Sequence, residues 1–67
     1  MDIEMSRHAL DQSRERGISI KEIETAITRG AKHLQVPHKI VADYTYIRVV
    51  YKIINEKCFI LTVMIRT

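Results

Sequence analysis

The fold is decided near the C-terminus, where residues 46–66 read YIRVVYKIINEKCFILTVMIR. Residues 46–54 and residues 58–66 are rich in β-branched and aromatic side chains, which favour β-strands. The polar residues 55–57 between them predict the loop of a β-hairpin. We therefore expect these two segments to form the long strands of a sheet.

The register of this hairpin decides which side chains share a face, because a one-residue shift exchanges the two faces. A two-residue loop would pair Ile54 with Lys57 and would place basic residues of the first strand among apolar residues of the second. A three-residue loop would pair Ile54 with Cys58 and would leave one apolar and one polar face. We therefore predict the three-residue loop. The apolar face toward the helices would hold Ile47, Val49, Tyr51, Ile53, Phe59, Leu61, Val63 and Ile65. The opposite face would hold Arg48, Lys52, Thr62 and Arg66, interleaved with Val50, Ile60 and Met64.

The first half of the chain predicts two helices, over residues 6–17 and 19–30. Ser6 is a natural N-cap, and Gly17 supplies a left-handed stop. Ser19 and Glu22 have the spacing of a capping box, which marks the start of the second helix. The two helices would form an αα-hairpin with a short corner.

Between the helices and the hairpin, two shorter segments have extended character. Residues 33–36 fit a short piece at a sheet edge, because Pro37 follows them directly. Residues 39–42 predict a short strand, and residues 43–45 predict a turn. The sequence thus predicts a single α+β domain over residues 1–67. Its N-terminal αα-hairpin would pack on one face of a three- to four-stranded antiparallel sheet.

Composition excludes several classes of protein. Cys58 is the single cysteine, so an intramolecular disulfide is impossible and a reducing, cytoplasmic setting is expected. The three histidines are not at compact ligand spacing, so we expect no metal. No nucleotide-binding or common hydrolase motif occurs, and we expect no cofactor. No apolar run approaches the length of a membrane span or a secretory signal, so no membrane association is expected.

Charge divides along the chain in the same place as the predicted structure. Residues 1–30 carry five basic and six acidic side chains, and residues 31–67 carry six basic and two acidic ones. The halves therefore sum to −1 and +4, which gives the net charge of +3. A basic sheet face is typical of proteins that bind a polyanion such as RNA. The alternative is that these charges only solvate the open face of an antiparallel sheet.

Two side chains outside the polar face are candidates for proton transfer. His8 follows the first N-cap, and histidine side chains commonly serve as general acids or bases in catalysis. Tyr46 has a phenol that can approach a reacting phosphate or stack on a base. The alternatives are a surface histidine and a tyrosine that caps the core.

Three segments together resemble a known family. These are SRHAL at residues 6–10, RGIS at residues 16–19 and LTV at residues 61–63, with a Glu-rich second helix between them. They resemble the domain-of-unknown-function family numbered 4258, which is similar to the RelE/ParE-like toxin folds. The resemblance runs from Ser6 to about Ile65.

The resemblance implies a helix–helix–sheet module and RNA cleavage on the sheet face, often on the ribosome. On matched positions it implies roles for His8, Arg16 and Arg48. Relatives often carry a basic residue one turn after the histidine, where this chain has Gln12.

The leading functional prediction is a small toxin-like protein that acts on RNA as a metal-independent endoribonuclease. The ribose 2′-OH would attack the adjacent phosphate, and preorganised cations would stabilise the developing charge. The predicted catalytic residues are His8, Tyr46, Arg48 and Arg66, and the predicted RNA-binding residues are Lys52, Thr62 and Arg16. The alternative is a non-catalytic module that binds RNA, the ribosome or a protein through the same face. An antitoxin-like partner and a homodimer are further expected partners.

Overall fold

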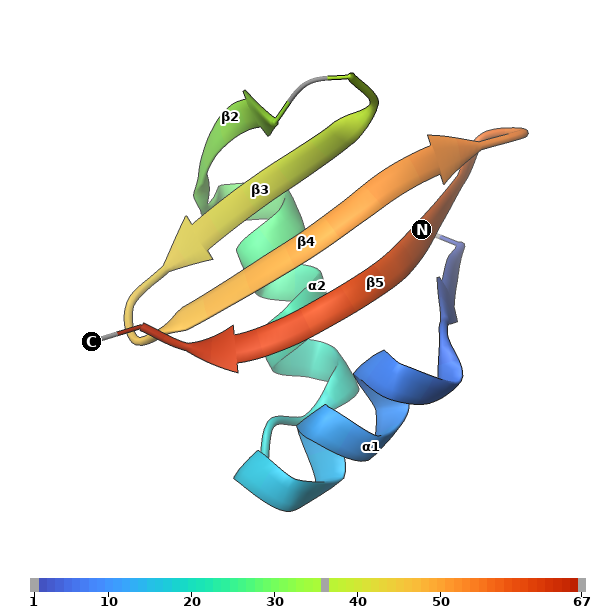
Figure 1. The fold of residues 1–67 in the computed structure, drawn as a ribbon. Helices are drawn as coiled ribbons and strands as arrows, with labels where there is room; N and C mark the ends of the chain where they lie inside the picture. The colour runs from blue at the N-terminus through green and yellow to red at the C-terminus, as the bar shows by residue number, and fades with distance from the viewer. Residues whose placement is uncertain (1, 36, 67) are drawn as a thin grey trace.

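The computed structural model describes residues 2–35 and 37–66, which form two helices and a five-stranded sheet (Figure 1). The strands lie in the order β1-β5-β4-β3-β2. In chain order the elements are β1 (Ile3–Met5), α1 (Arg7–Arg16), α2 (Ile20–Arg29), β2 (Ala31–Gln35), β3 (Lys39–Tyr44), β4 (Ile47–Ile54) and β5 (Lys57–Ile65).

The α+β class is confirmed, but the predicted strand number and the all-antiparallel sheet are wrong. Strands β2 to β5 are antiparallel to their neighbours, whereas β1 pairs with β5 in parallel. Strand β1 has three residues, too few for a periodic pattern to be read from the sequence. It becomes a strand because β5 offers it a free edge, with Glu4 opposite Phe59.

The shorter strands also differ from their predicted limits. Strand β3 extends to Tyr44, so the turn into β4 is formed by residues 45–46 rather than 43–45. Strand β2 begins directly after α2, at Ala31, two residues earlier than the predicted extended piece. That piece was expected to reach Val36, which lies outside the described residues.

Both helices begin and end where local signals predict. The Ser6 hydroxyl accepts a hydrogen bond from the Ala9 amide, and Ser19 and Glu22 form the reciprocal capping box. Gly17 has φ +66°, the left-handed conformation that glycine adopts without a steric penalty. Gly30 is extended instead, and a Cβ there would lie 2.7 Å from the Asp43 carbonyl oxygen.

The core lies between the sheet and the helices, which cover the same side of it (Figure 1). Helix α1 packs on β5 and β1, and α2 packs on β3 and β4. Five side chains are the largest of those that are fully buried, and burying each contributes about 1.5–3 kcal/mol. They are Ile23, Ile47, Val49, Ile60 and Val63. Cys58 is a buried free thiol. No helix in the described part of the chain is long and apolar enough to cross a membrane.

The β4–β5 turn has two residues, so the predicted three-residue loop is wrong. Ile54 pairs with Lys57, not with Cys58. Asn55 and Glu56 have φ values of +49° and +66°, the left-handed conformations that match a two-residue turn to the twist of the strands. Asparagine tolerates this conformation well, whereas the glutamate adopts it because the flanking pairs hold it there.

A β-bulge in β5 restores the separation of the two faces. Val50 pairs with Thr62 and the next residue, Tyr51, pairs with Ile60, so Leu61 is the extra residue. Cys58, Ile60, Val63 and Ile65 therefore lie on the helix side with the alternate residues of β4. Phe59 was predicted on the core face and Ile60 on the opposite face, and the two-residue turn reverses both assignments.

Ser6 and Gln12 bind the backbone of β5 around this bulge through one backbone and two side-chain hydrogen bonds. The Ser6 amide donates to the Ile60 carbonyl oxygen at 2.9 Å, and the Ser6 hydroxyl donates to the Leu61 carbonyl oxygen at 3.2 Å. The Gln12 side-chain oxygen accepts from the Val63 amide at 3.0 Å. Beyond the end of β1, side chains of α1 and its cap therefore take over the hydrogen bonds of a missing strand.

We predict that Gln12→Ala lowers the free energy of unfolding by about 1–3 kcal/mol, because the Val63 amide is left buried without an acceptor. Urea unfolding measures the loss, and amide hydrogen exchange should show that Val63 loses protection. Gln35→Ala, on exposed β2, is the matched control and should change neither quantity. A Val63 amide that exchanges equally slowly in both variants would contradict this role for Gln12.

Candidate nucleic-acid interface

The sheet face opposite the helices is here called the outer face. The strand registers place alternate residues of each strand on it, and Arg66 continues the row of β5. It is formed by Glu4, Ala31, His33, Gln35, Lys39, Val41, Asp43, Arg48, Val50, Lys52, Ile54, Lys57, Phe59, Thr62, Met64 and Arg66.

Cationic side chains outnumber acidic ones on the outer face. Five lysines and arginines face two carboxylates, which gives 5 − 2 = +3 among the described residues. On helices α1 and α2, five cations face four carboxylates, so that layer sums to +1. The excess positive charge of the chain is therefore gathered on the side of the sheet that no helix covers. Its members are Lys39, Arg48, Lys52, Lys57 and Arg66.

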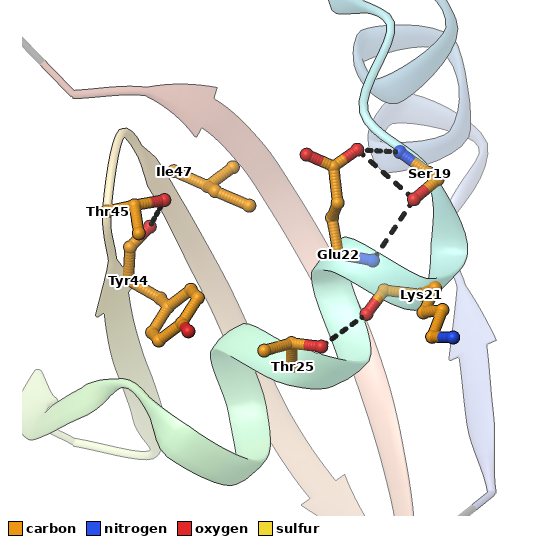
Figure 2. Close-up of a pocket in the computed structure, with 7 residues that line it drawn as sticks. All are labelled: Ser19, Lys21, Glu22, Thr25, Tyr44, Thr45 and Ile47. Carbon is orange, nitrogen blue, oxygen red and sulfur yellow. Dashed lines mark hydrogen bonds between the residues drawn. The ribbon is translucent and has the colours of Figure 1, made fainter.

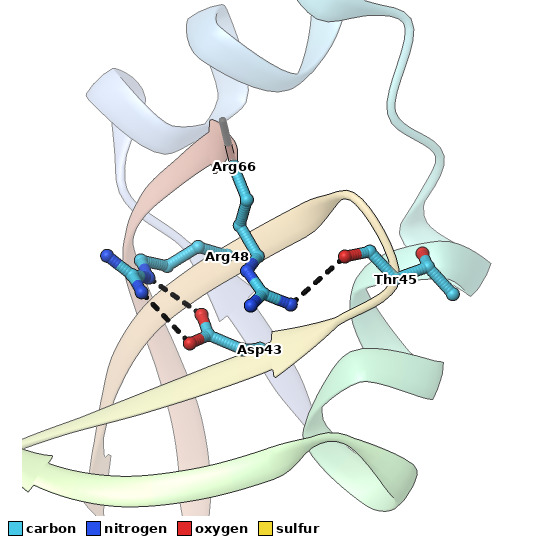
Figure 3. Close-up of polar contacts among 4 residues, drawn as sticks. All are labelled: Asp43, Thr45, Arg48 and Arg66. Carbon is cyan, nitrogen blue, oxygen red and sulfur yellow. Dashed lines mark hydrogen bonds and ion pairs between the residues drawn. The ribbon is translucent and has the colours of Figure 1, made fainter.

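Arg48 is held by a carboxylate that sequence analysis did not assign to it. Asp43 lies directly opposite it on β3, and the two form a forked pair with distances of 2.7 Å and 3.0 Å (Figure 3). The Asp43 side chain is 9% exposed and that of Arg48 is 41% exposed. Its hydrogen bond to Arg48 keeps the pKa of Asp43 below the ordinary value, against the opposing effect of burial. The predicted turn at residues 43–45 had placed Asp43 outside the strand.

Arg66 lies beside this pair and is anchored through the β3–β4 turn. Its backbone amide donates to the Tyr46 carbonyl oxygen at 2.7 Å, and its guanidinium donates to the Thr45 carbonyl oxygen at 3.0 Å. Figure 3 shows the side chain lying across the sheet next to Arg48 and Asp43. Both arginines are thus positioned by contacts that leave further N–H donors of each guanidinium free.

Lys52 and Thr62 complete the group predicted for this face. Lys52 lies opposite Phe59 and forms no ion pair with any residue in 2–35 or 37–66. Thr62 lies opposite Val50. Val50 and its neighbour Val41 are 9% and 5% exposed, although no helix covers them. The apolar centre of the face is therefore shielded from solvent by other residues of the sheet itself.

The other predicted site residues lie elsewhere. His8 and Arg16 are exposed on α1, in the helical layer, and the Arg16 guanidinium donates to the Gln12 carbonyl oxygen at 3.5 Å. The Tyr46 hydroxyl donates to a carboxylate oxygen of Glu22, at the start of α2, at 2.6 Å. This bond lowers the pKa of Glu22 and raises that of Tyr46. The structure therefore gathers Arg48, Lys52, Thr62 and Arg66 and separates His8, Arg16 and the Tyr46 phenol from them.

A small cleft lies near the Tyr46–Glu22 contact, between α2 and the β3–β4 turn (Figure 2). Its volume is about 180 Å³. The Glu22 carboxylate, its main charged acceptor, is already bound by the amide and the hydroxyl of Ser19. The Glu22 carboxylate in this cleft thus serves to cap the N-terminus of α2. Its lining residues are Ser19, Lys21, Glu22, Thr25, Tyr44, Thr45 and Ile47.

The described residues hold no cluster of three or more histidine, cysteine or acidic side chains arranged to bind a metal ion.

The chain belongs to the family described as "Domain of unknown function (DUF4258)", whose model matches residues 5–65. No curated protein matches the chain. No solved structure matches it either, so the expected likeness to the RelE/ParE-like toxin folds stays a prediction. The family name carries no activity, and a functional proposal has to rest on the site itself.

We predict that Arg48→Met destabilises the protein most at neutral pH. The folded-state pKa of Asp43 lies below its unfolded value of about 3.8, so the pair stabilises the fold above pH 4 and loses this effect as pH falls through the folded pKa. In Arg48→Met, burial without a partner raises the Asp43 pKa instead. The stability difference from the wild type should therefore shrink as pH falls from 7 to 3 in urea unfolding.

The double variant Asp43→Asn/Arg48→Met is the control for this experiment. Its stability is compared with that of Asp43→Asn, in which residue 43 no longer titrates, so the difference between these two variants should not vary with pH. A stability difference for Arg48→Met that stays constant from pH 7 to pH 3 would contradict the coupling of the two residues.

Proposed function

We propose that this protein binds RNA through the outer face of its sheet. The observation that carries the proposal is the gathering of five cationic side chains on the one layer that the helices leave open. Phosphate neutralisation supplies most of the affinity of such surfaces for nucleic acid, and arginine forks match phosphate geometry. Thr62 adds a neutral hydroxyl to the same surface.

The Arg48–Asp43 pair supports phosphate binding rather than opposing it. Asp43 occupies two of the five N–H donors of the guanidinium and leaves three for a ligand. Because the carboxylate fixes the guanidinium plane, less side-chain entropy is lost when a phosphate binds. Lys52 and Arg66 contribute further charges, and neither forms an ion pair within the described residues.

The arrangement favours RNA binding over RNA cleavage. An endoribonuclease needs a proton-transfer group within about 3 Å of the reacting atoms, together with cations on the phosphate. His8 lies in the helical layer, and the phenol of Tyr46 is bonded to Glu22. The two groups predicted to transfer the proton, His8 and the Tyr46 phenol, thus do not lie beside the cations of the outer face. We therefore place RNA binding first, and cleavage is a separate outcome of the test.

A protein partner is the second candidate for the same face, and the burial pattern argues against it. Stable protein interfaces are built around an apolar core that both partners desolvate. On the outer face, Val41 and Val50 are already buried by their own neighbours. The centre of the outer face therefore offers a protein partner mainly charged side chains.

We predict that Lys52→Gln/Arg66→Gln weakens the binding of single-stranded RNA and reduces the slope of log K against log salt by about 1.4, which is about 0.7 for each lost phosphate contact. Fluorescence anisotropy with a labelled oligonucleotide at several salt concentrations gives both values. Arg7→Gln/Lys21→Gln is the matched control, because it removes two exposed cations from the helical layer. It should leave the slope unchanged.

Two results would count against the proposal. Equal loss in both double variants would show that RNA responds to net charge alone, and absence of binding to the wild type at low salt would remove RNA as the ligand. Gel analysis of the same RNA reports cleavage, and new RNA ends that disappear in His8→Ala would restore the endoribonuclease hypothesis.

A further inference from the structure

The outer face carries a hollow at the end away from the arginines. It lies at the tip of the β4–β5 hairpin, next to β1, and its volume is about 250 Å³. Pockets for drug-sized ligands measure about 300–1,000 Å³, so this one has room for a smaller group. Five residues line it: Glu4, Ile54, Asn55, Lys57 and Phe59.

Three chemical features lie in a fixed order across the sheet at this hollow, two of them in its lining. Phe59 lies on β5, with Lys52 opposite it on β4 and Glu4 opposite it on β1. A cation, an aromatic ring and a carboxylate thus lie side by side on three neighbouring strands. Ile54 and Lys57 form the adjacent pair toward the turn.

The Glu4 carboxylate is free to bind a ligand. It takes part in none of the hydrogen bonds or ion pairs among residues 2–35 and 37–66, and it is exposed. The outer face thus presents an acceptor with two oxygens at the rim of a pocket whose other charged lining residue is Lys57. A ligand that suits this pocket has a planar apolar face, a negative charge and adjacent hydrogen-bond donors.

We propose that the hollow binds one unpaired guanine base of the RNA, an inference that rests on the proposed function of the outer face. The base would stack on Phe59 and Ile54, as bases of single-stranded RNA stack on aromatic side chains. The N1–H and N2–H donors of guanine are adjacent, and a carboxylate such as Glu4 accepts both at once. Lys52 and Lys57 would bind the flanking phosphates.

Other bases match this pocket less well. Adenine, cytosine and uracil do not carry N–H donors on two adjacent nitrogen positions, as guanine does at N1 and N2. Glu4 would therefore accept at most one hydrogen bond from each of these three bases. Asn55 also lines the pocket, and its side-chain amide would supply a donor for the guanine O6. A base inside a duplex cannot enter, because its face is stacked and its edge is paired. The proposal therefore specifies single-stranded RNA with guanine.

The test uses four labelled oligouridines that differ at one central position: guanosine, inosine, adenosine or an abasic site. Inosine keeps N1–H and lacks the N2 amino group. With the wild-type chain we expect the guanosine strand to bind about tenfold more tightly than the abasic strand, with inosine between them. Phe59→Leu should remove most of the advantage of guanosine over the abasic strand. Glu4→Gln should remove mainly the difference between guanosine and inosine.

Glu15 is an exposed carboxylate on α1, and Glu15→Gln is the matched control. It should leave the four strands in the same order of affinity as the wild type does. Equal, salt-dependent binding of the four strands by the wild type would overturn the guanine site and leave RNA binding by the outer face intact. No binding of any strand at low salt would overturn the proposed function itself. The wild-type comparison decides the matter even where a variant folds poorly.

Discussion

One extra residue in β5 governs the rest of the structure. The two-residue turn at Asn55 and Glu56 sets a register that, continued without a break, would put Val63 and Ile65 on the face of Arg48 and Lys52. The bulge at Leu61 changes the phase once, so the helix side stays apolar and the outer face stays polar. The burial of Val63 and the position of Arg66 beside Arg48 both depend on that change of phase.

The bulge also ties the helical layer to the sheet. A disrupted strand at a sheet edge leaves backbone groups without partners, and these are costly when they are buried. Ser6 and Gln12 bind the carbonyl of Leu61 and the amide of Val63, on either side of Thr62. Gln12 stands where relatives are expected to carry a basic residue, and in this chain its side-chain carboxamide has a structural role. The position of α1 and the register of β5 thus stabilise each other.

Sequence patterns predicted what depends on local chemistry and missed what depends on pairing. The caps at Ser6 and Ser19 follow from spacings of a few residues, and both were predicted. Three features depend instead on how strands pair with one another, which the sequence does not state. They are the bulge, the parallel pairing of β1 and the Asp43–Arg48 pair. One prediction about the sheet faces holds although the predicted loop is wrong: the same face carries Arg48, Lys52, Thr62 and Arg66. Beyond Leu61, the two-residue turn together with the one-residue bulge assigns side chains to the same faces as a three-residue loop without a bulge.

The central claim is that Leu61 is an unpaired extra residue that sorts the side chains of β5 between the two faces. Cross-strand nuclear Overhauser effects between β4 and β5 test it most directly, because they report register residue by residue. The account predicts contacts of Ile54 with Lys57 and of Tyr51 with Ile60 on one side of Leu61, and of Val49 with Val63 on the other. Contacts of Ile54 with Cys58 and of Tyr51 with Leu61, in one unbroken register, would contradict it.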